Sequence, residues 1–121
     1  MSGEAKRALK TAEEAVAVAR SKETLFWELQ SQNALAAVLL RRGRSEDQFR
    51  IAEILDRADH LIEQTGGDVM KPVIAELRAQ LAGLKGDNAG RRRMLQKAFD
   101  LYISMEAVGS AEQLAARLKA L

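Results

Sequence analysis

The chain of 121 residues contains no cysteine and has little proline, histidine or aromatic side chain. The absence of cysteine excludes disulfides, zinc fingers and thiol nucleophiles. One proline and an aromatic content of 4% disfavour strands, because a pleated surface prefers β-branched and aromatic side chains. No apolar run approaches the ~20 residues that span a bilayer, and no signal-peptide-like segment follows the N-terminus. These features predict an all-α cytoplasmic protein that does not contact membranes.

Apolar residues instead recur at three- and four-residue steps, the period of amphipathic helices. Their spacing predicts about six helices joined by short turns, within one domain that covers residues 1–121. The expected helices are at about 4–20, 24–42, 45–65, 71–85, 87–105 and 110–121.

The expected helix ends carry recognisable turn residues. Glycines at the ends of three helices can adopt the left-handed conformation that terminates a helix, and these are Gly43, Gly66 and Gly86. Ser45 and Ser110, each followed three residues later by glutamine, have the spacing of a capping box, and Asp87 or Asn88 caps the fifth helix. Gly109 is expected to stop the chain before the last helix.

Two helical hairpins have the same design. The segment 32–44 resembles the segment 72–87, with Ala36 matching Ala79 and Gly43 matching Gly86. Each segment precedes a helix with a small residue in its core, Ala58 in the first and Ala98 in the second. Repeated helical hairpins are typical of binding scaffolds, so the pattern favours a non-catalytic interaction module.

These hairpins resemble tetratricopeptide-type repeats, in a divergent version that lacks the canonical tryptophan, tyrosine and closing proline. The resemblance implies antiparallel hairpins wound into a right-handed superhelix. From Ile51 onward the chain also looks like the C-terminal repeat tail of bacterial multidomain signalling proteins with adenylate/guanylate cyclase or AAA/STAND ATPase domains. That likeness is carried by I-L-D-R-A-D-H-L-I-E-Q-T-G-G, P-V-I-A-E-L-R-A-Q-L-A-G-L-K-G-D and L-Q-K-A-F-D-L-Y-I-S-M-E-A-V-G-S-A-E-Q-L-A-A-R-L. It implies a fragment of a signalling protein and transfers no catalytic residue.

In repeat scaffolds of this kind, the first helix of each hairpin lines a concave groove, which here means the second, fourth and sixth helices. We therefore expect a peptide, helix or neighbouring domain to bind between residues that border this groove, namely Gln30, Asn33, Ala37, Leu40, Arg41, Val73, Glu76, Gln80 and Gly83. Asn33 and Gln80 would bond the backbone of the ligand, and Arg41 would bind a carboxylate.

An alternative function is nucleic-acid binding. Six arginines fall at equivalent turns of the two hairpins and could form a basic edge: Arg41, Arg42, Arg44, Arg91, Arg92 and Arg93. The net charge is only +2, and no pattern of interleaved aromatic and basic residues supports this alternative.

Little in the chain suggests catalysis or a cofactor. His60 is the one histidine, and Asp56 lies one turn before it. A metal site or an oriented base would need further ligands or a nucleophile, so we interpret this histidine as part of a polar helix face and expect no cofactor, metal or active site.

The first expected helix has more apolar surface than one buried face requires. Ala5, Ala8, Leu9, Ala12, Ala15, Val16 and Ala19 form a stripe, with Ala17 and Val18 beside it. Such surface predicts either a missing upstream hairpin helix or a homodimer through this helix. Phe26 and Trp27 are expected to pack in the core or between repeats, and an exposed aromatic anchor is the alternative.

Overall fold

The computed structural model describes residues 3–21 and 25–121, and of residues 18–21 the backbone alone. The described residues form six α-helices and no strand, which confirms the all-α prediction. The helices are α1 (Gly3–Ser21), α2 (Leu25–Arg42), α3 (Gln48–Thr65), α4 (Lys71–Leu84), α5 (Asn88–Ser104) and α6 (Val108–Lys119). Short 3₁₀ turns at Ser45–Asp47 and Asp68–Met70 precede α3 and α4. The expected start of the second helix at Thr24 lies outside the described residues.

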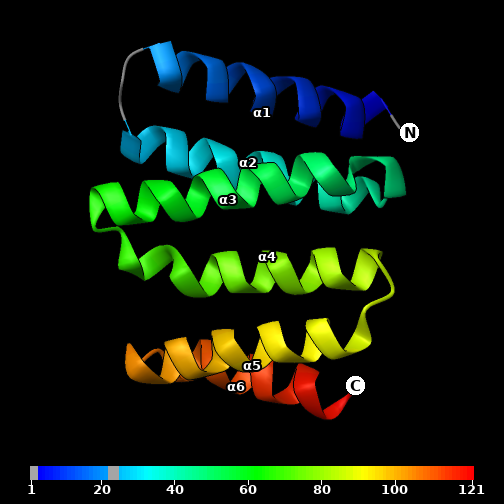
Figure 1. The fold of residues 1–121 in the computed structure, drawn as a ribbon, viewed down its shortest axis with the longest axis vertical. Helices are drawn as coiled ribbons and strands as arrows, with labels where there is room; N and C mark the ends of the chain where they lie inside the picture. The colour runs from blue at the N-terminus through cyan, green and yellow to red at the C-terminus, as the bar shows by residue number, and fades with distance from the viewer. Residues whose placement is uncertain (1–2, 22–24) are drawn as a thin grey trace.

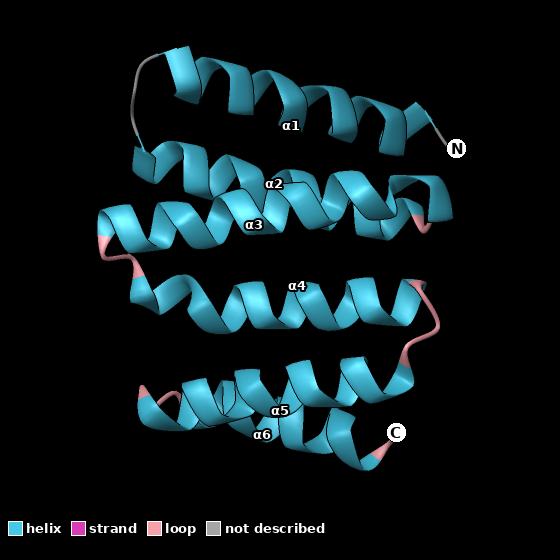
Figure 2. Cartoon of the chain, viewed as in Figure 1, coloured by secondary structure: helices cyan, strands magenta, loops and turns pink. Residues whose placement is uncertain are grey.

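Successive helices run antiparallel and stack along the long axis of the molecule, with α1 at one end and α6 at the other (Figure 1). Loops are confined to the short turns at the two sides of the stack (Figure 2). Each helix packs against the next one in sequence, and α2 also contacts α4. This pattern agrees with the expected hairpins, and the right-handed sense of the superhelix stays a prediction.

The hydrophobic core consists of two clusters that meet at α4. The larger cluster takes side chains from α1 to α4, including the fully buried Leu29 and Leu55. The smaller one joins α4, α5 and α6 around Leu95 and Leu114. Opposite stripes of α4 serve the two clusters: Ile74, Leu77 and Leu81 face the first, whereas Ala75 and Ala79 face the second. The alanines allow α5 and α6 to approach closely.

The predicted glycine turns are confirmed. Gly43, Gly66 and Gly86 have φ angles of 66°, 69° and 76°, a region that glycine enters without steric cost. The Asp87 cap is also confirmed, because its Oδ1 accepts a hydrogen bond from the Gly90 backbone nitrogen at 2.9 Å.

The two serine capping boxes are wrong. Ser45 opens a 3₁₀ turn, and α3 begins only at Gln48 without a side-chain cap. Ser110 lies inside α6, which begins at Val108, so Gly109 does not stop the chain. The turn before α6 is made instead by Glu106, whose φ is 60°. The amides of Glu106 and Ala107 bond back to Ile103 and Tyr102, which is the Schellman arrangement.

Large apolar side chains near the beginnings of α2 and α3 are exposed. Phe49 is 86% exposed because the buried stripe of α3 begins at Ile51, and residues two apart on a helix point to nearly opposite sides. Trp27 and Phe26 are 60% and 50% exposed, which corrects the expectation of core packing. Their rings contact each other edge to face, with centroids 5.7 Å apart.

Helix α1 buries one narrow stripe against α2, formed by Leu9, Ala12 and Val16. Ala8 and Ala15, which were expected in this stripe, are exposed. Of the expected second flank, Ala17 is exposed, and the side chain of Val18 lies outside the described residues. A homodimer through this helix stays a prediction. Within the described chain, no helix has the length and apolar character that a bilayer crossing would require.

Candidate functional site

Three of the residues predicted to bind a partner on α2 lie on the same side of the helix. Gln30, Asn33 and Ala37 follow at steps of three and four residues, so their side chains point the same way. The Gln30 Nε2 lies 4.0 Å from the Met70 Sδ, which places this side of α2 next to the entrance of α4. Phe26, one turn before Gln30, extends the same stripe to the beginning of α2. We call the four residues Phe26, Gln30, Asn33 and Ala37 the α2 stripe.

Asn33 has an unusual environment. The residue is 93% buried, at 7% exposure, and neither Nδ2 nor Oδ1 has a hydrogen-bond partner. A buried polar group without a partner costs ~1–3 kcal/mol of stability relative to a paired one. Unsatisfied side-chain amides are rare in native proteins, so this one marks a place where stability has not been optimised.

Arg41 lies away from the α2 stripe. Its side chain is exposed and lines a small hollow of about 210 Å³ together with Glu4, Ala5, Ala8 and Val38. Three of those four residues belong to α1. Arg41 therefore borders the α1 side of α2 and is not brought together with Glu76 and Gln80.

Glu76 on α4 is occupied by contacts within the chain. Its Oε2 accepts a hydrogen bond from the Tyr102 hydroxyl at 2.6 Å, and its Oε1 pairs with Arg117 Nη1 at 3.1 Å. One carboxylate thus connects α4, α5 and α6. Burial, together with the bond to Glu76, raises the pKa of Tyr102 to about 12. Of the predicted α4 residues, Gln80 remains exposed and available to a partner.

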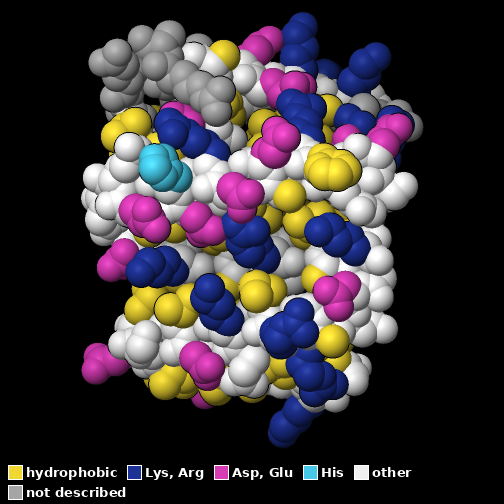
Figure 3. Space-filling model, in the orientation of Figure 1, with side chains coloured by type: hydrophobic (Ala, Val, Ile, Leu, Met, Phe, Trp, Pro, Cys, Tyr) yellow, Lys and Arg dark blue, Asp and Glu magenta, His cyan; other side chains and the backbone are white. Residues whose placement is uncertain are grey.

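The arginine turns do come to the same side of the stack, since the α2–α3 and α4–α5 connections both lie on the right in Figure 1. However, Arg42 pairs with Asp47 at 3.4 Å, and Arg44 pairs with Glu46 at 3.2 Å. Arg91 belongs to the first turn of α5, and its side chain lies beside Gly83 of α4. Acidic and basic side chains are also intermixed over α3 and α4 on the face drawn in Figure 3. The predicted basic edge is therefore reduced mainly to Arg92 and Arg93.

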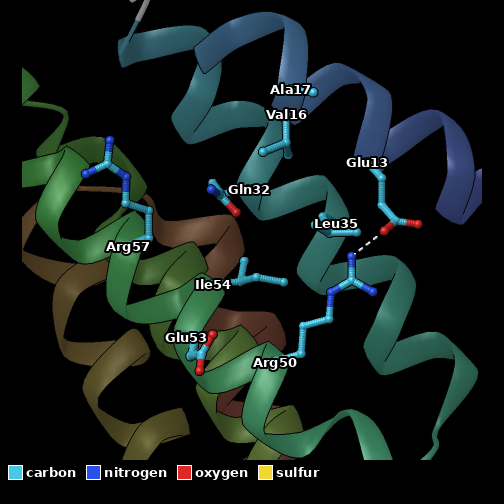
Figure 4. A pocket seen from close by; sticks show the side chains of 9 residues that line it. All are labelled: Glu13, Val16, Ala17, Gln32, Leu35, Arg50, Glu53, Ile54 and Arg57. Carbon is cyan, nitrogen blue, oxygen red and sulfur yellow. Dashed lines mark hydrogen bonds and ion pairs between the residues drawn. The ribbon is translucent and has the colours of Figure 1, made fainter. Parts of the chain in front are cut away.

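A cleft that the sequence did not indicate lies between α1 and α3, with α2 as its floor (Figure 4). Its volume is about 790 Å³, and Val16, Leu35 and Ile54 form its apolar centre. Glu13 and Arg50 form an ion pair across it. Among the described side chains, α1 and α3 meet across this space mainly through that pair.

A buried polar cluster forms the other end of this cleft. The Arg57 guanidinium binds both carboxylate oxygens of Glu28, and Gln32 Nε2 donates to Glu28 Oε2 at 3.2 Å. Glu28 is 2% exposed, and its hydrogen bond raises the pKa of Arg57 above the ordinary value. The sequence signal was present: Glu28 and Gln32 are one turn apart on a face of α2 that is otherwise apolar.

His60 is exposed, as a residue of a polar helix face should be. Asp56, one turn away, is bound by Arg78 of α4. The Arg78 Nη2 donates to Asp56 Oδ1 at 2.9 Å and to Asp59 Oδ2 at 2.6 Å. Among the described residues, no three His, Asp or Glu side chains gather as a metal site would require.

The geometry defines an all-α protein built from stacked antiparallel hairpins, with the α2 stripe on one side of α2 and a cleft between α1 and α3. Comparison of the chain with protein-family models, with curated proteins and with solved structures finds no match.

Proposed function

We propose that this chain is a non-catalytic protein-interaction module that binds a partner segment on the face formed by α2, α4 and α6. The observation that carries the proposal is Asn33, whose side-chain amide is buried without a hydrogen-bond partner. An amide has two donor hydrogens and an acceptor oxygen, the set needed to bond a peptide group of an incoming chain. A partner that supplies those bonds recovers the stability lost at this position.

The neighbours of Asn33 support this function. Phe26 is half exposed at the end of the α2 stripe, and exposed aromatic side chains often contribute most to interface affinity. Gln30, near Asn33 on the α2 stripe, is held by one long contact of 4.0 Å to a sulfur atom, so its amide can exchange that contact for one to a partner at little cost. Gln80 offers an exposed amide on α4.

The test begins with peptides selected for binding to the protein from a random displayed library. Asn33→Leu keeps the number and branching of heavy atoms but removes the amide. We expect the selected peptides to lose most of their affinity for Asn33→Leu, measured by fluorescence anisotropy, and to lose less for Gln80→Ala. Gln64→Ala, which removes an exposed amide on α3, is the matched control and should bind as the unaltered protein does. Unchanged binding by both Asn33→Leu and Gln80→Ala would refute the proposed face.

A further inference from the structure

A second surface, separate from the α2 stripe, lies at the far end of the stack. Side chains of α5 and α6 line a shallow groove of about 720 Å³ that no other described helix covers. Two adjacent stripes of α5 form one wall, with residues four apart in each: Arg92, Gln96 and Asp100, then Arg93, Lys97 and Leu101. Leu118 of α6 meets Leu101 in the floor.

No side-chain carboxylate of the described structure pairs with the cations of this groove. Within the described structure, neither Arg93 nor Lys97 forms an ion pair, and Arg92 donates only to the Leu121 main-chain oxygen at 3.2 Å. The one acidic side chain of the wall, Asp100, accepts a hydrogen bond from Gln96 at 3.0 Å instead. Figure 3 shows basic side chains gathered over the start of α5. The groove is thus positive on its rim and apolar in its floor.

The position of these cations is unfavourable in the isolated chain. Arg92 and Arg93 lie near the N-terminus of α5, where the helix dipole repels positive charge. Arg93 and Lys97 are one turn apart on the same helix, a like-charge spacing that destabilises helices. Unlike Arg78, which binds two aspartates, Arg93 and Lys97 form no ion pair in the described structure that would offset this repulsion.

We propose that this groove binds an acidic amphipathic helix of a partner protein. The apolar side of that helix would rest on Leu101 and Leu118, and its carboxylates would lie against Arg92, Arg93 and Lys97. From Arg92 to Leu101 the wall extends ~14 Å at the rise of an α-helix, so it matches about three turns of a partner helix. Charge complementarity would select acidic helices and exclude basic ones.

Nucleic acid fits the groove less well. An apolar floor offers nothing to phosphate oxygens, and the lining contains no aromatic side chain on which a base could stack. The groove also lacks the dense positive field of a phosphate-binding surface, because Asp100 places a negative charge at one end of the wall.

The test uses two labelled helical peptides with the same leucine stripe, one with glutamates and the other with lysines beside it. Anisotropy at physiological salt should show binding of the glutamate peptide alone, and methyl NMR should place the largest shifts at Leu101 and Leu118. The double variant Arg93→Glu, Lys97→Glu should weaken binding about tenfold or more, because each former attraction becomes a repulsion.

The matched control is Lys6→Glu, Lys10→Glu on α1, which makes the same change of charge at the same spacing on an exposed helix. It should bind the glutamate peptide within about twofold of the unaltered protein, since screening limits distant surface charges. Circular dichroism of all variants checks that the helices are retained. Asn33→Leu should also bind normally, because this groove is independent of the proposed α2 face.

Three outcomes would overturn the proposal: equal binding of both peptides, equal weakening by the α1 control, or shifts away from α5 and α6. A thymidine oligonucleotide, added as a competitor, distinguishes a site for acidic helices from a site for polyanions in general. If it competes with the glutamate peptide and depends equally on Arg93 and Lys97, the groove recognises polyanions in general and not an acidic helix.

Discussion

The guanidinium of Arg57 on α3 binds the carboxylate of Glu28 on α2 through two hydrogen bonds. Nε donates to Oε2 at 2.8 Å, and Nη2 donates to Oε1 at 2.9 Å. The two side chains differ in exposure, at 35% for Arg57 and 3% for Glu28. The pair therefore fixes α2 against α3 from the solvent side, while the carboxylate itself is almost wholly removed from water.

Loss of Arg57 should therefore cost more than loss of a surface arginine. We expect Arg57→Met to lower the free energy of unfolding by ~2 kcal/mol, less than for a fully buried pair because solvent reaches the guanidinium. Urea unfolding measures the change, and a double-mutant cycle with Glu28→Gln isolates the coupling. Arg44→Met, which breaks an exposed pair with Glu46, is the control and should cost less than ~0.5 kcal/mol. Equal costs would show that the Glu28 pair contributes little.

Tyr102 should make stability depend on pH in the alkaline range. Its pKa is about 12 in the folded chain, above the ordinary 10.0 expected when the chain unfolds. The folded state therefore holds the phenolic proton more tightly, and the stabilisation is complete below pH ~10 and declines as pH rises from there towards 12. Absorbance near 295 nm should report the raised midpoint, since Tyr102 is the one tyrosine.

Tyr102→Phe provides the control for that pH dependence. It removes the hydroxyl bond to Glu76 and should cost ~1 kcal/mol at neutral pH. The decline between pH 10 and 12 that comes from the phenol should then vanish. An unchanged decline would assign it to other groups.

Two glycine-to-alanine substitutions should change the stability of the fold in opposite directions. A Cβ on Gly90 would lie 2.3 Å from Asp87 Oδ2, so Gly90→Ala must displace the capping carboxylate. We expect a loss of ~1 kcal/mol, the usual value of an N-cap. A Cβ on Gly83 would meet Arg91 at an ordinary 3.6 Å, so Gly83→Ala should stabilise α4 by up to ~0.5–1 kcal/mol. Thermal unfolding of both variants tests the contrast, which fails if both shift the same way.

Asn33→Leu should make the isolated protein more stable. The change replaces two unsatisfied buried polar atoms with methyl groups of similar placement, and we expect a gain of ~1 kcal/mol. The melting temperature should rise by a few degrees. Asn88→Leu, at an exposed site, is the comparison and should give no such gain. A destabilised Asn33→Leu would mean that the amide has a bonding role within the fold.

The helices and their glycine turns could be predicted from the sequence because each depends on residues close together in the chain. Apolar spacing located all six helices, and Gly86 showed where α4 ends. Glu106 makes the same left-handed turn after α5, yet no propensity points to it. The backbone bonds to Tyr102 and Ile103 stabilise that turn, and glutamate accepts the strained φ.

The candidate site was harder to predict because it depends on which side of each helix meets which neighbour. On α2, apolar residues surround most of the helix, so spacing alone could not show that Trp27 is exposed. Nor could it show that Glu76 is bound by α5 and α6, since Tyr102 and Arg117 are 26 and 41 residues away in the chain.

The antiparallel stack, with its first helix at one pole and its last at the other, has a mechanical consequence. Tension applied to the two chain ends acts along the stacking axis, across the contacts between helices and at right angles to the helices themselves. Load in that direction opens one interface after another, whereas shear would break many contacts together. Ala75 and Ala79 face one hydrophobic cluster, and Ile74 and Leu77 face the other. The two clusters therefore follow one another along the direction of the load, with α4 between them. When it is pulled from its ends, the chain should extend in small steps at low force and refold when the force is released.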